Sequence, residues 1–365
     1  MTRGKIDKVF LAIVISLVVL GVFVFSSASL GILVKNEAKF YSIIFNQIIL
    51  GLTGGLLALT LFSRINYRVW RKYAFFIFLF AIIVSTLVFV PGIGLEHNGA
   101  KRWILLGSFS FQPSELLKIA FVIYFAAWLS SIKDKITKPL YSFLPFIIIA
   151  GICAVILIKE PDIGTLIVLF VTGIIMLFVA GARLRMITFF GVLTVVGVIV
   201  LSFVKPYLKA RILTFLNPAI DPLGASYQLQ QSLIAIGSGG IFGRGFGQSI
   251  QKFNFLPEPV GDSIFAVYSE EFGLIGAVIL ITLFLAFTLR GLKIANTAND
   301  GFGKLLAVGL VMLIFIQSFI NIGSMIGLVP LTGVPVAFIS HGGTALLFAL
   351  TEVGILLNIS RYAKG

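Results

Sequence analysis

A few acidic side chains beside long apolar segments are the residues of this sequence best suited to chemistry. Asp262 stands directly before the apolar run that starts at Ser263. A carboxylate at a helix start either caps free backbone N–H groups or, where it faces a substrate hydroxyl, accepts a proton. Position alone leaves both interpretations open. The dipole of the following helix predicts a low pKa and therefore a weak base, which desolvation by a bound substrate would have to strengthen.

Two other segments place charge at the ends of apolar runs. Glu115 and Lys118 are three residues apart, so they share a helix face and are close enough to form an ion pair. Asp162 follows Pro161 in a short stretch between two apolar runs, which is typical of a turn. A charged side chain inside a membrane is costly unless it forms an ion pair or takes part in a functional site. Either explanation fits these two segments, so a structural role and a functional role both stay open.

Glu270 and Glu271 lie about two turns inside the apolar run that follows Asp262. Two adjacent carboxylates are expensive at this depth of a membrane helix. At least one of them is therefore expected to face a polar interior.

Cations are concentrated in the segment 205–262, which contains Lys205, Lys209, Arg211, Arg244 and Lys252. Positive residues favour the cytoplasmic side of a membrane, so cations in an outer loop indicate a phosphate or pyrophosphate ligand. Contact with anionic lipid is the open alternative. The glycine-rich run 237–247 is compatible with an anion-holding backbone nest, but the chain has no Gly-Lys-Ser/Thr motif, so nucleotide hydrolysis is not indicated.

Metal and cofactor chemistry has little support in the sequence. His97 and His341 are isolated, and Cys153 is the only cysteine, so neither a zinc site nor an internal disulfide is expected. A divalent cation, Mg²⁺ or Mn²⁺, held between Asp262 and substrate phosphates stays open. No organic cofactor is expected.

Composition identifies the element type that must position these residues. Apolar residues make up 59% of the 365 positions and charged residues 12%, which is about half the charged share of a soluble domain. The apolar runs are long enough to cross a bilayer, and they must be helices to satisfy their backbone groups in lipid. We expect an all-α polytopic membrane protein with about ten transmembrane helices, at 9–30, 40–63, 73–91, 114–132, 141–158, 163–181, 187–204, 263–289, 304–325 and 344–360.

The distribution of charge predicts the orientation of these helices. Positive residues mark alternate loops and both ends of the chain, which places the N- and C-termini in the cytoplasm and the acidic candidates outside. The net charge of +14 is explained by this topology, so no nucleic-acid partner is expected. The apolar run near Val9 is too long for a signal peptide. We expect one integral membrane domain, 1–365, with a large folded extracytoplasmic loop, 205–262, between the seventh and eighth helices.

Several longer motifs occur in a fixed order along nearly the whole chain. They are Lys101-Arg102-Trp103-Ile104, Phe111 to Lys118, Glu160 to Thr165, Tyr227 to Ser232, Phe255-Leu256-Pro257-Glu258 with Asp262, Asn321-Ile322-Gly323, and Pro335 to Gly343. In these segments the chain resembles the SEDS family (shape, elongation, division and sporulation) of FtsW- and RodA-like proteins. The direct continuation from Gly247 to Gln251-Lys252 is closer to FtsW than to RodA.

The resemblance implies a peptidoglycan glycosyltransferase of the bacterial cytoplasmic membrane, which polymerises lipid II on the outer face in cell division or elongation. It implies a class B penicillin-binding protein as partner, a growing glycan strand as second substrate, and contacts with other divisome or elongasome membrane proteins. Asp262 is then the essential carboxylate, and Glu115, Lys118 and Asp162 line or shape the cavity. The remaining substrate-binding candidates are Arg102, Lys209, Arg211, Gln231, Ser232, Arg244, Lys252, Ser340 and His341.

The chain departs from the family pattern at two places. Pro259-Val260-Gly261 precedes Asp262 where the family more often has Ala-His-Thr, and His341 stands where a tyrosine is usual. Two other functions use the same residues: a transporter of lipid II, in which Asp262 has no chemical role, and a non-catalytic membrane scaffold that recruits cell-wall enzymes. The clustering of acidic residues outside and the absence of an internal repeat favour the enzyme.

Overall fold

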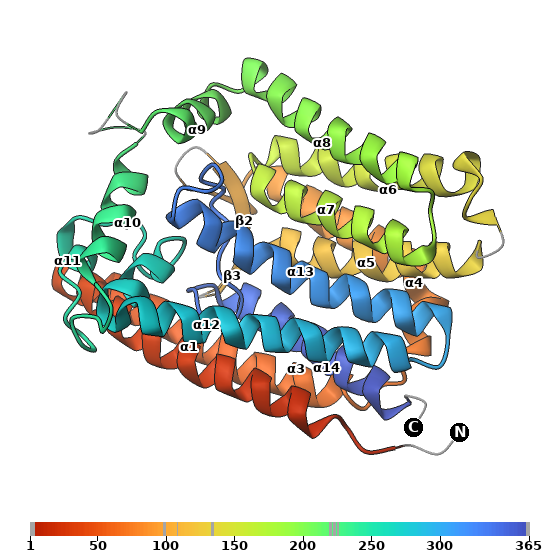
Figure 1. The fold of residues 1–365 in the computed structure, drawn as a ribbon, viewed down its shortest axis with the longest axis horizontal. Helices are drawn as coiled ribbons and strands as arrows, with labels where there is room; N and C mark the ends of the chain where they lie inside the picture. The colour runs from red at the N-terminus through yellow and green to blue at the C-terminus, as the bar shows by residue number, and fades with distance from the viewer. Residues whose placement is uncertain are drawn as a thin grey trace.

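The computed structural model describes residues 4–97, 100–107, 109–132, 135–218, 221, 224 and 226–362. Long helices lie side by side along the length of the molecule (Figure 1). The helices are α1 (Lys8–Lys35), α2 (Glu37–Phe45), η1 (Asn46–Gly54), α3 (Gly55–Phe62), α4 (Arg68–Thr86), η2 (Leu87–Phe89), α5 (Pro113–Ser131), α6 (Pro139–Lys159), α7 (Ile163–Ala180), α8 (Leu184–Val204), α9 (Pro206–Leu216), α10 (Tyr227–Ser238), α11 (Gln251–Asn254), α12 (Ile264–Thr297), α13 (Gly301–Met325) and α14 (Gly343–Arg361).

The expectation of a polytopic helical membrane protein is confirmed. Ten helical segments of the described chain are long and apolar enough to cross a membrane, and each overlaps one expected span. They are Lys8–Lys35, Glu37–Phe62, Arg68–Phe89, Pro113–Ser131, Leu140–Lys159, Ile163–Ala180, Leu184–Val204, Ile264–Thr297, Gly301–Met325 and Gly343–Arg361. The second span joins α2, the π-helical η1 and α3 into one continuous run.

Helix ends follow ordinary capping chemistry. The Asp7 side chain accepts a hydrogen bond from the Phe10 backbone at the start of α1, and Asp300 does the same for Gly303 at the start of α13. The α7 helix ends at Gly181, whose φ of 95° is the left-handed conformation that glycine adopts without a Cβ clash.

The helices divide into a buried centre and a lipid-facing rim. Most residues in the apolar windows of α13 and α14 are buried, 83% and 89%, whereas only 11% are buried in α8. Side chains such as Val192, Val200 and Phe203 on α8 are therefore exposed on the bundle, as expected where lipid replaces a protein neighbour.

One end of the bundle carries the irregular structure. The helices α9, α10 and α11 and a small sheet lie at this end, and both termini lie at the other (Figure 1). The sheet is antiparallel in the order β1 (Gly94–His97), β2 (Ala100–Leu106) and β3 (Phe109–Phe111). The sequence did not predict this sheet, because its strands are short and lie within an expected loop. It leads directly into α5.

Candidate active site

Asp262 lies at the irregular end of the bundle, two residues before α12 begins. Asn321 on α13 fixes its backbone, since the Asn321 amide donates to the carbonyl oxygens of Asp262, at 2.8 Å, and Val334, at 2.7 Å. One buried amide therefore joins the segment that carries Asp262 to the loop between α13 and α14.

The same α13–α14 loop holds the residues just before Asp262. The Ser340 hydroxyl donates to the Gly261 carbonyl at 2.9 Å, and the His341 backbone N–H donates to the Val260 carbonyl at 2.6 Å. Ser340 also accepts a hydrogen bond from the Val336 backbone. These contacts give the Ser340 hydroxyl and the His341 backbone a positioning role. The His341 side chain, whose Nε2 has no hydrogen-bond partner among the described residues, stays a predicted substrate contact.

The Asp262 carboxylate differs from its backbone in having no bonded partner. Among the described residues, none donates a hydrogen bond to it or forms an ion pair with it within 4 Å. Of the two interpretations left open by the sequence, helix capping does not hold: Ser263 occupies the cap position of α12, and the Asp262 side chain caps no backbone group. The side chain is half-buried, so its oxygens stay available to a ligand.

Arg211 on α9 faces this carboxylate across Gly333. A Cβ atom on Gly333 would lie 3.3 Å from Asp262 Oδ2 and 3.6 Å from Arg211 Nη2. Gly333 also has a φ of 75°, which disfavours other residues. The missing side chain therefore leaves a shared space between the carboxylate and the guanidinium.

Burial and neighbouring charge set the pKa of Asp262. Burial, and to a smaller extent the negative charge of Glu258, raises the pKa of Asp262 to about 6 against the opposing positive charges of Arg211 and Arg102. The low pKa predicted from the helix start is wrong, because desolvation outweighs the helix dipole at this position. A carboxylate with this pKa is mostly ionised at neutral pH yet basic enough to accept a proton.

Two residues one helical turn apart bring α9 into the site. The Arg211 guanidinium lies 6.0 Å from the centroid of the Tyr207 ring, and the Tyr207 hydroxyl is buried without a hydrogen-bond partner in the described chain. Burial raises the pKa of Tyr207, so the hydroxyl keeps its proton. Lys209, between them in the sequence, is exposed and forms no ion pair with a described residue.

Arg102 on β2 fixes the turn between α6 and α7. Its guanidinium donates to the backbone carbonyls of Glu160, at 3.0 Å, and Pro161. The Glu160 carboxyl is buried without a partner among the described residues, and burial raises the pKa of Glu160 to about 9, which keeps it neutral. Asp162 caps α7 by accepting hydrogen bonds from the Thr165 backbone, at 3.2 Å, and hydroxyl, at 2.9 Å.

The expected Glu115–Lys118 contact is present and fully buried. Lys118 Nζ lies 2.9 Å from Glu115 Oε2 and also donates to the Gln317 side chain on α13. Gln317 in turn donates to the Pro335 carbonyl at 3.0 Å. The ion pair is thus linked through α13 to the loop that holds the Asp262 segment.

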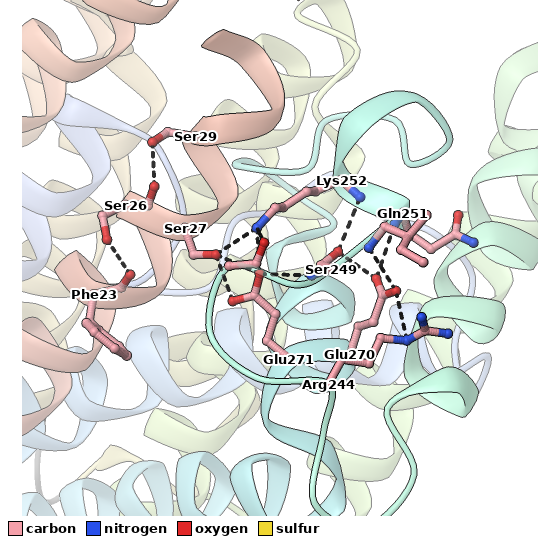
Figure 2. A network of polar contacts seen from close by, with 12 residues as sticks. Phe23, Ser26, Ser27, Ser29, Arg244, Ser249, Gln251, Lys252, Glu270 and Glu271 are labelled. Atoms are coloured by element: carbon pink, nitrogen blue, oxygen red, sulfur yellow. Dashed lines mark hydrogen bonds and ion pairs between the residues drawn. The ribbon is translucent and has the colours of Figure 1, made fainter. Parts of the chain in front are cut away.

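Lys252 does not reach the candidate site. Its side chain is fully buried and forms an ion pair of 2.7 Å with Glu271, while Nζ also donates to Ser27 on α1 at 2.9 Å. Figure 2 shows these groups converging from α1, α11 and α12. The third N–H of the ammonium donates to the Gly247 carbonyl at 2.9 Å, so no donor is left for a substrate phosphate. The substrate-binding role predicted for Lys252 is therefore corrected to a structural one.

Glu270 forms the second half of this network. Its carboxylate accepts hydrogen bonds from the Ser249 hydroxyl, at 2.5 Å, and from the Ile250 and Gln251 backbone, and Arg244 Nε lies 3.5 Å away. The expectation that at least one of the two adjacent carboxylates faces a polar interior is met by both. Arg244 is directed to Glu270 (Figure 2), not to Asp262.

The glycine-rich run fills a break in α12. Gly273 has a φ of 64° inside the helix, and loop backbone groups replace the lost helical hydrogen bonds there. The Arg244 and Gly245 N–H groups donate to the Glu270 and Glu271 carbonyls, and the Gly240 and Ile241 carbonyls accept from Leu274 and Ile275. A Cβ on Gly239 or Gly243 would lie 2.1 Å from an α12 carbonyl oxygen. The run serves this close approach to α12; the anion nest with which its sequence was compatible is not needed to explain its glycines.

The two remaining candidates lie on α10. Ser232 is buried and donates to the Gln228 carbonyl at 2.8 Å and to Met325 Sδ, so it packs α10 on α13. Gln231 is half-buried. Gln228, one turn before Ser232, donates to the Ser263 hydroxyl at 3.1 Å. Gln228 therefore contacts the residue that directly follows Asp262.

Sequence reasoning missed several members of the site: Glu160, Tyr207, Glu258 and Gly333. Tyr207 had a usable signal, because it precedes Arg211 by four residues and so shares its helix face. Gly333 had none, since its importance depends on two side chains that are distant in the sequence.

No resident metal site is formed by the described side chains. They contain no group of three or more His, Cys, Asp or Glu residues that would hold an ion. Mg²⁺ is commonly held by one or two carboxylates together with substrate phosphates, and Asp262 supplies one such carboxylate. A divalent cation shared between Asp262 and substrate phosphates stays a prediction.

The whole chain matches one protein family. The model of the family of FtsW, RodA and SpoVE, described as cell cycle proteins, matches residues 7–365. The chain belongs to this family. The family resemblance found in the motifs is thereby confirmed.

Individual relatives support the same assignment. Stage V sporulation protein E of Bacillus subtilis is 39% identical over 367 residues, covering 100% of both chains. The probable peptidoglycan glycosyltransferase FtsW of Geobacter sulfurreducens is 40% identical over 362 residues, covering 99% of this chain and 96% of its own length.

Solved structures share the fold. A chain of a peptidoglycan synthase complex that coordinates polymerization and crosslinking is 25% identical, with a TM-score of 0.79 and 98% of each chain covered. The rod shape determining protein RodA of Thermus thermophilus has a TM-score of 0.71 at 24% identity, covering 98% of this chain and 97% of its own.

Proposed function

We propose that the chain polymerises lipid II into glycan strands, with Asp262 as the proton acceptor. The observation that carries this proposal is the Asp262 carboxylate, which is held by its backbone, lacks a bonded partner and has a pKa of about 6. The names of its relatives, which include probable peptidoglycan glycosyltransferases, support the same reaction.

The reaction requires a proton acceptor and a cation from the protein. Asp262 takes the proton of the acceptor sugar hydroxyl as its oxygen attacks the anomeric carbon of the donor. The bond from that carbon to the lipid pyrophosphate breaks, and the pyrophosphate leaves with the bonding electrons. Arg211, which faces Asp262 across Gly333, offers a cation to the negative charge that develops on the leaving group.

Neighbouring groups suit this division of roles. The guanidinium of Arg102 lies close enough to lower the pKa of Asp262 and adds positive charge to the same space. The unpartnered Tyr207 hydroxyl can donate a hydrogen bond to a phosphate or sugar oxygen. We propose that lipid II and the growing strand meet here, with any Mg²⁺ or Mn²⁺ carried on the pyrophosphate.

The membrane orientation and the partner are parts of the same proposal. Both termini lie at the end of the bundle away from α9 to α11 (Figure 1), and positive loops at that end favour the cytoplasm. Asp262 then faces the outer side of the bacterial cytoplasmic membrane. The structural similarity to a synthase complex supports a class B penicillin-binding protein as the crosslinking partner.

The test is lipid II polymerisation by the chain reconstituted in liposomes, with and without its cognate transpeptidase, beside a lipid II translocation assay on the same vesicles. Glycan strands made by the wild type support the proposal. Translocation without any polymer in either condition would favour a transporter. Neither activity, with the partner still bound, would favour a scaffold.

A further inference from the structure

A charged cavity lies at the opposite end of the bundle from Asp262. It has a volume of about 280 Å³ and lies where the residues before α1 meet the end of α12. Its walls include the side chains of Lys5, Lys8, Arg290 and Lys293. Figure 1 shows the N-terminal segment at this end of the molecule.

Ordered contacts hold the walls of the cavity in place. The single Nε–H of Arg290 is shared between the two carboxylate oxygens of Asp7, at 2.9 and 3.1 Å, and Asp7 also accepts a hydrogen bond from the Phe10 backbone. The Asp7 backbone N–H donates to Ser360 on α14, and the Gly4 N–H donates to the Arg361 carbonyl. The cavity is therefore built by three segments distant in sequence, α1, α12 and α14.

The charges of the cavity do not cancel. Asp7 is the only carboxylate among the wall residues, and Arg290 already occupies both of its oxygens. Lys5, Lys8 and Lys293 are exposed and form no ion pair with any described residue. Three amines around one cavity favour an anion, and a phosphate group satisfies several amines at once.

Apolar residues in the same walls specify the kind of anion. Ile6, Val9 and Ile294 line the cavity beside the amines, and Val9 is 53% exposed on the lipid-facing side of a transmembrane helix. The volume is at the lower limit of small-molecule pockets, so it suits a headgroup and not a whole lipid. Basic pockets between transmembrane helices are known to bind anionic lipid headgroups.

We infer that this cavity binds the phosphodiester headgroup of an anionic membrane lipid in the leaflet opposite Asp262. The acyl chains extend over Val9 and the apolar faces of α1 and α12. The inference is independent of the glycosyltransferase proposal, because none of these residues lies near the candidate active site.

The test is native mass spectrometry of the whole protein in detergent, titrated with equal amounts of phosphatidylglycerol and phosphatidylcholine. The wild type retains phosphatidylglycerol preferentially. The Lys5→Gln/Lys293→Gln variant loses about thirtyfold in affinity, since each lysine contributes about 1 kcal/mol. The matched control, Arg183→Gln/Arg185→Gln, removes the same charge from exposed positions at the same end of the bundle and binds like the wild type.

Three results would overturn the inference. If the lysine variant binds phosphatidylglycerol like the wild type, the cavity is not the binding site. If the control variant loses as much affinity, the lipid is attracted by the overall positive charge and not by a specific site. A parallel titration with inorganic phosphate separates a lipid from a free anion. If phosphate binds but phosphatidylglycerol is not preferred over phosphatidylcholine, the ligand is not a lipid. Thermal unfolding of all three proteins serves to show that the variants are folded.

Discussion

The part of α12 before its break, residues 264–272, has carboxylates at or next to each end, and their environments differ. At the far end, Glu270 and Glu271 are buried and bonded to cations, hydroxyls and backbone N–H groups. Directly before the near end, Asp262 faces cations but bonds to none in the described chain. The comparison teaches that carboxylates of one helix segment can differ in how many bonded partners they have, and this number, not residue type, is the basis on which we propose Asp262 as the proton acceptor.

The difference has a physical cause. A buried carboxylate keeps its charge only if its oxygens are bonded, so the Glu270 and Glu271 network fixes the loop against the helix break. Asp262 is held instead through backbone carbonyls, by Asn321 and Ser340. The backbone thus positions the side chain while no described residue donates a hydrogen bond to its carboxylate oxygens, which is the arrangement that a proton acceptor requires.

The largest effect is expected for Asp262→Asn. Removing a general base typically lowers the rate about 10²–10⁴-fold, and we expect a loss of this size in lipid II polymerisation. The unfolding temperature should stay close to that of the wild type, because no described group bonds to the carboxylate. Initial rates of glycan formation, normalised to folded protein, check this outcome; a rate within a few fold of the wild type would contradict it.

Glu271→Gln should mainly lower stability. It leaves the Lys252 ammonium buried without its counter-charge, which typically costs about 3–5 kcal/mol in the free energy of unfolding. Denaturant or thermal unfolding in detergent measures the loss. The control is Lys252→Met combined with Glu271→Gln, which removes both charges and should recover much of the stability. If the single variant is as stable as the wild type, the pair is not structural.

Arg211→Gln should lower the rate and shift its pH dependence. The rate falls about a hundredfold at neutral pH, as when one charge-stabilising donor is removed. Arg211 lowers the pKa of Asp262, so its loss raises that pKa above about 6. Because the base works when ionised, the acidic limb of the pH–rate profile moves to higher pH. Arg244→Gln is the control, and an unmoved limb in Arg211→Gln would argue against the pairing of roles.

The smallest effect is expected for Lys209→Gln. Lys209 is exposed on α9 between the two residues that face the site, and exposed substitutions usually change free energies by less than about 0.5 kcal/mol. Polymerisation should change by less than about twofold. A loss comparable to that of Arg211→Gln would place Lys209 at the substrate.

The membrane spans could be predicted from the sequence, because lipid enforces helices wherever apolar runs are long. The distribution of positive residues along the chain also predicted which helix ends carry the acidic candidates. Asp262 followed from the family resemblance, and the Glu115–Lys118 pair followed from helix periodicity. The break at Gly273 was not predicted, since a single glycine in an apolar run carries no sign of the loop that inserts there.

Charge alone misled the assignment of partners. Lys252 and Arg244 lie in a loop rich in cations, and the sequence gives no sign that Glu271 and Glu270 are close to them in space. Nineteen residues separate Lys252 from Glu271. Conversely, the Asp262 pKa depends on burial by segments from α9 to α14, which local sequence does not encode. These wrong predictions therefore concern contacts between segments that are apart in the sequence. Such contacts decide whether a charged side chain is paired within the protein or can reach a ligand.

The most direct test measures Asp262→Asn and Glu271→Gln side by side in the same liposomes, as polymerisation rate per folded molecule and as unfolding temperature. The account predicts a crossed result: Asp262→Asn loses its rate by at least about a hundredfold with an unchanged unfolding temperature, and Glu271→Gln unfolds earlier while each folded molecule keeps most of its rate. Full activity of folded Asp262→Asn would contradict the assignment of Asp262 as the proton acceptor.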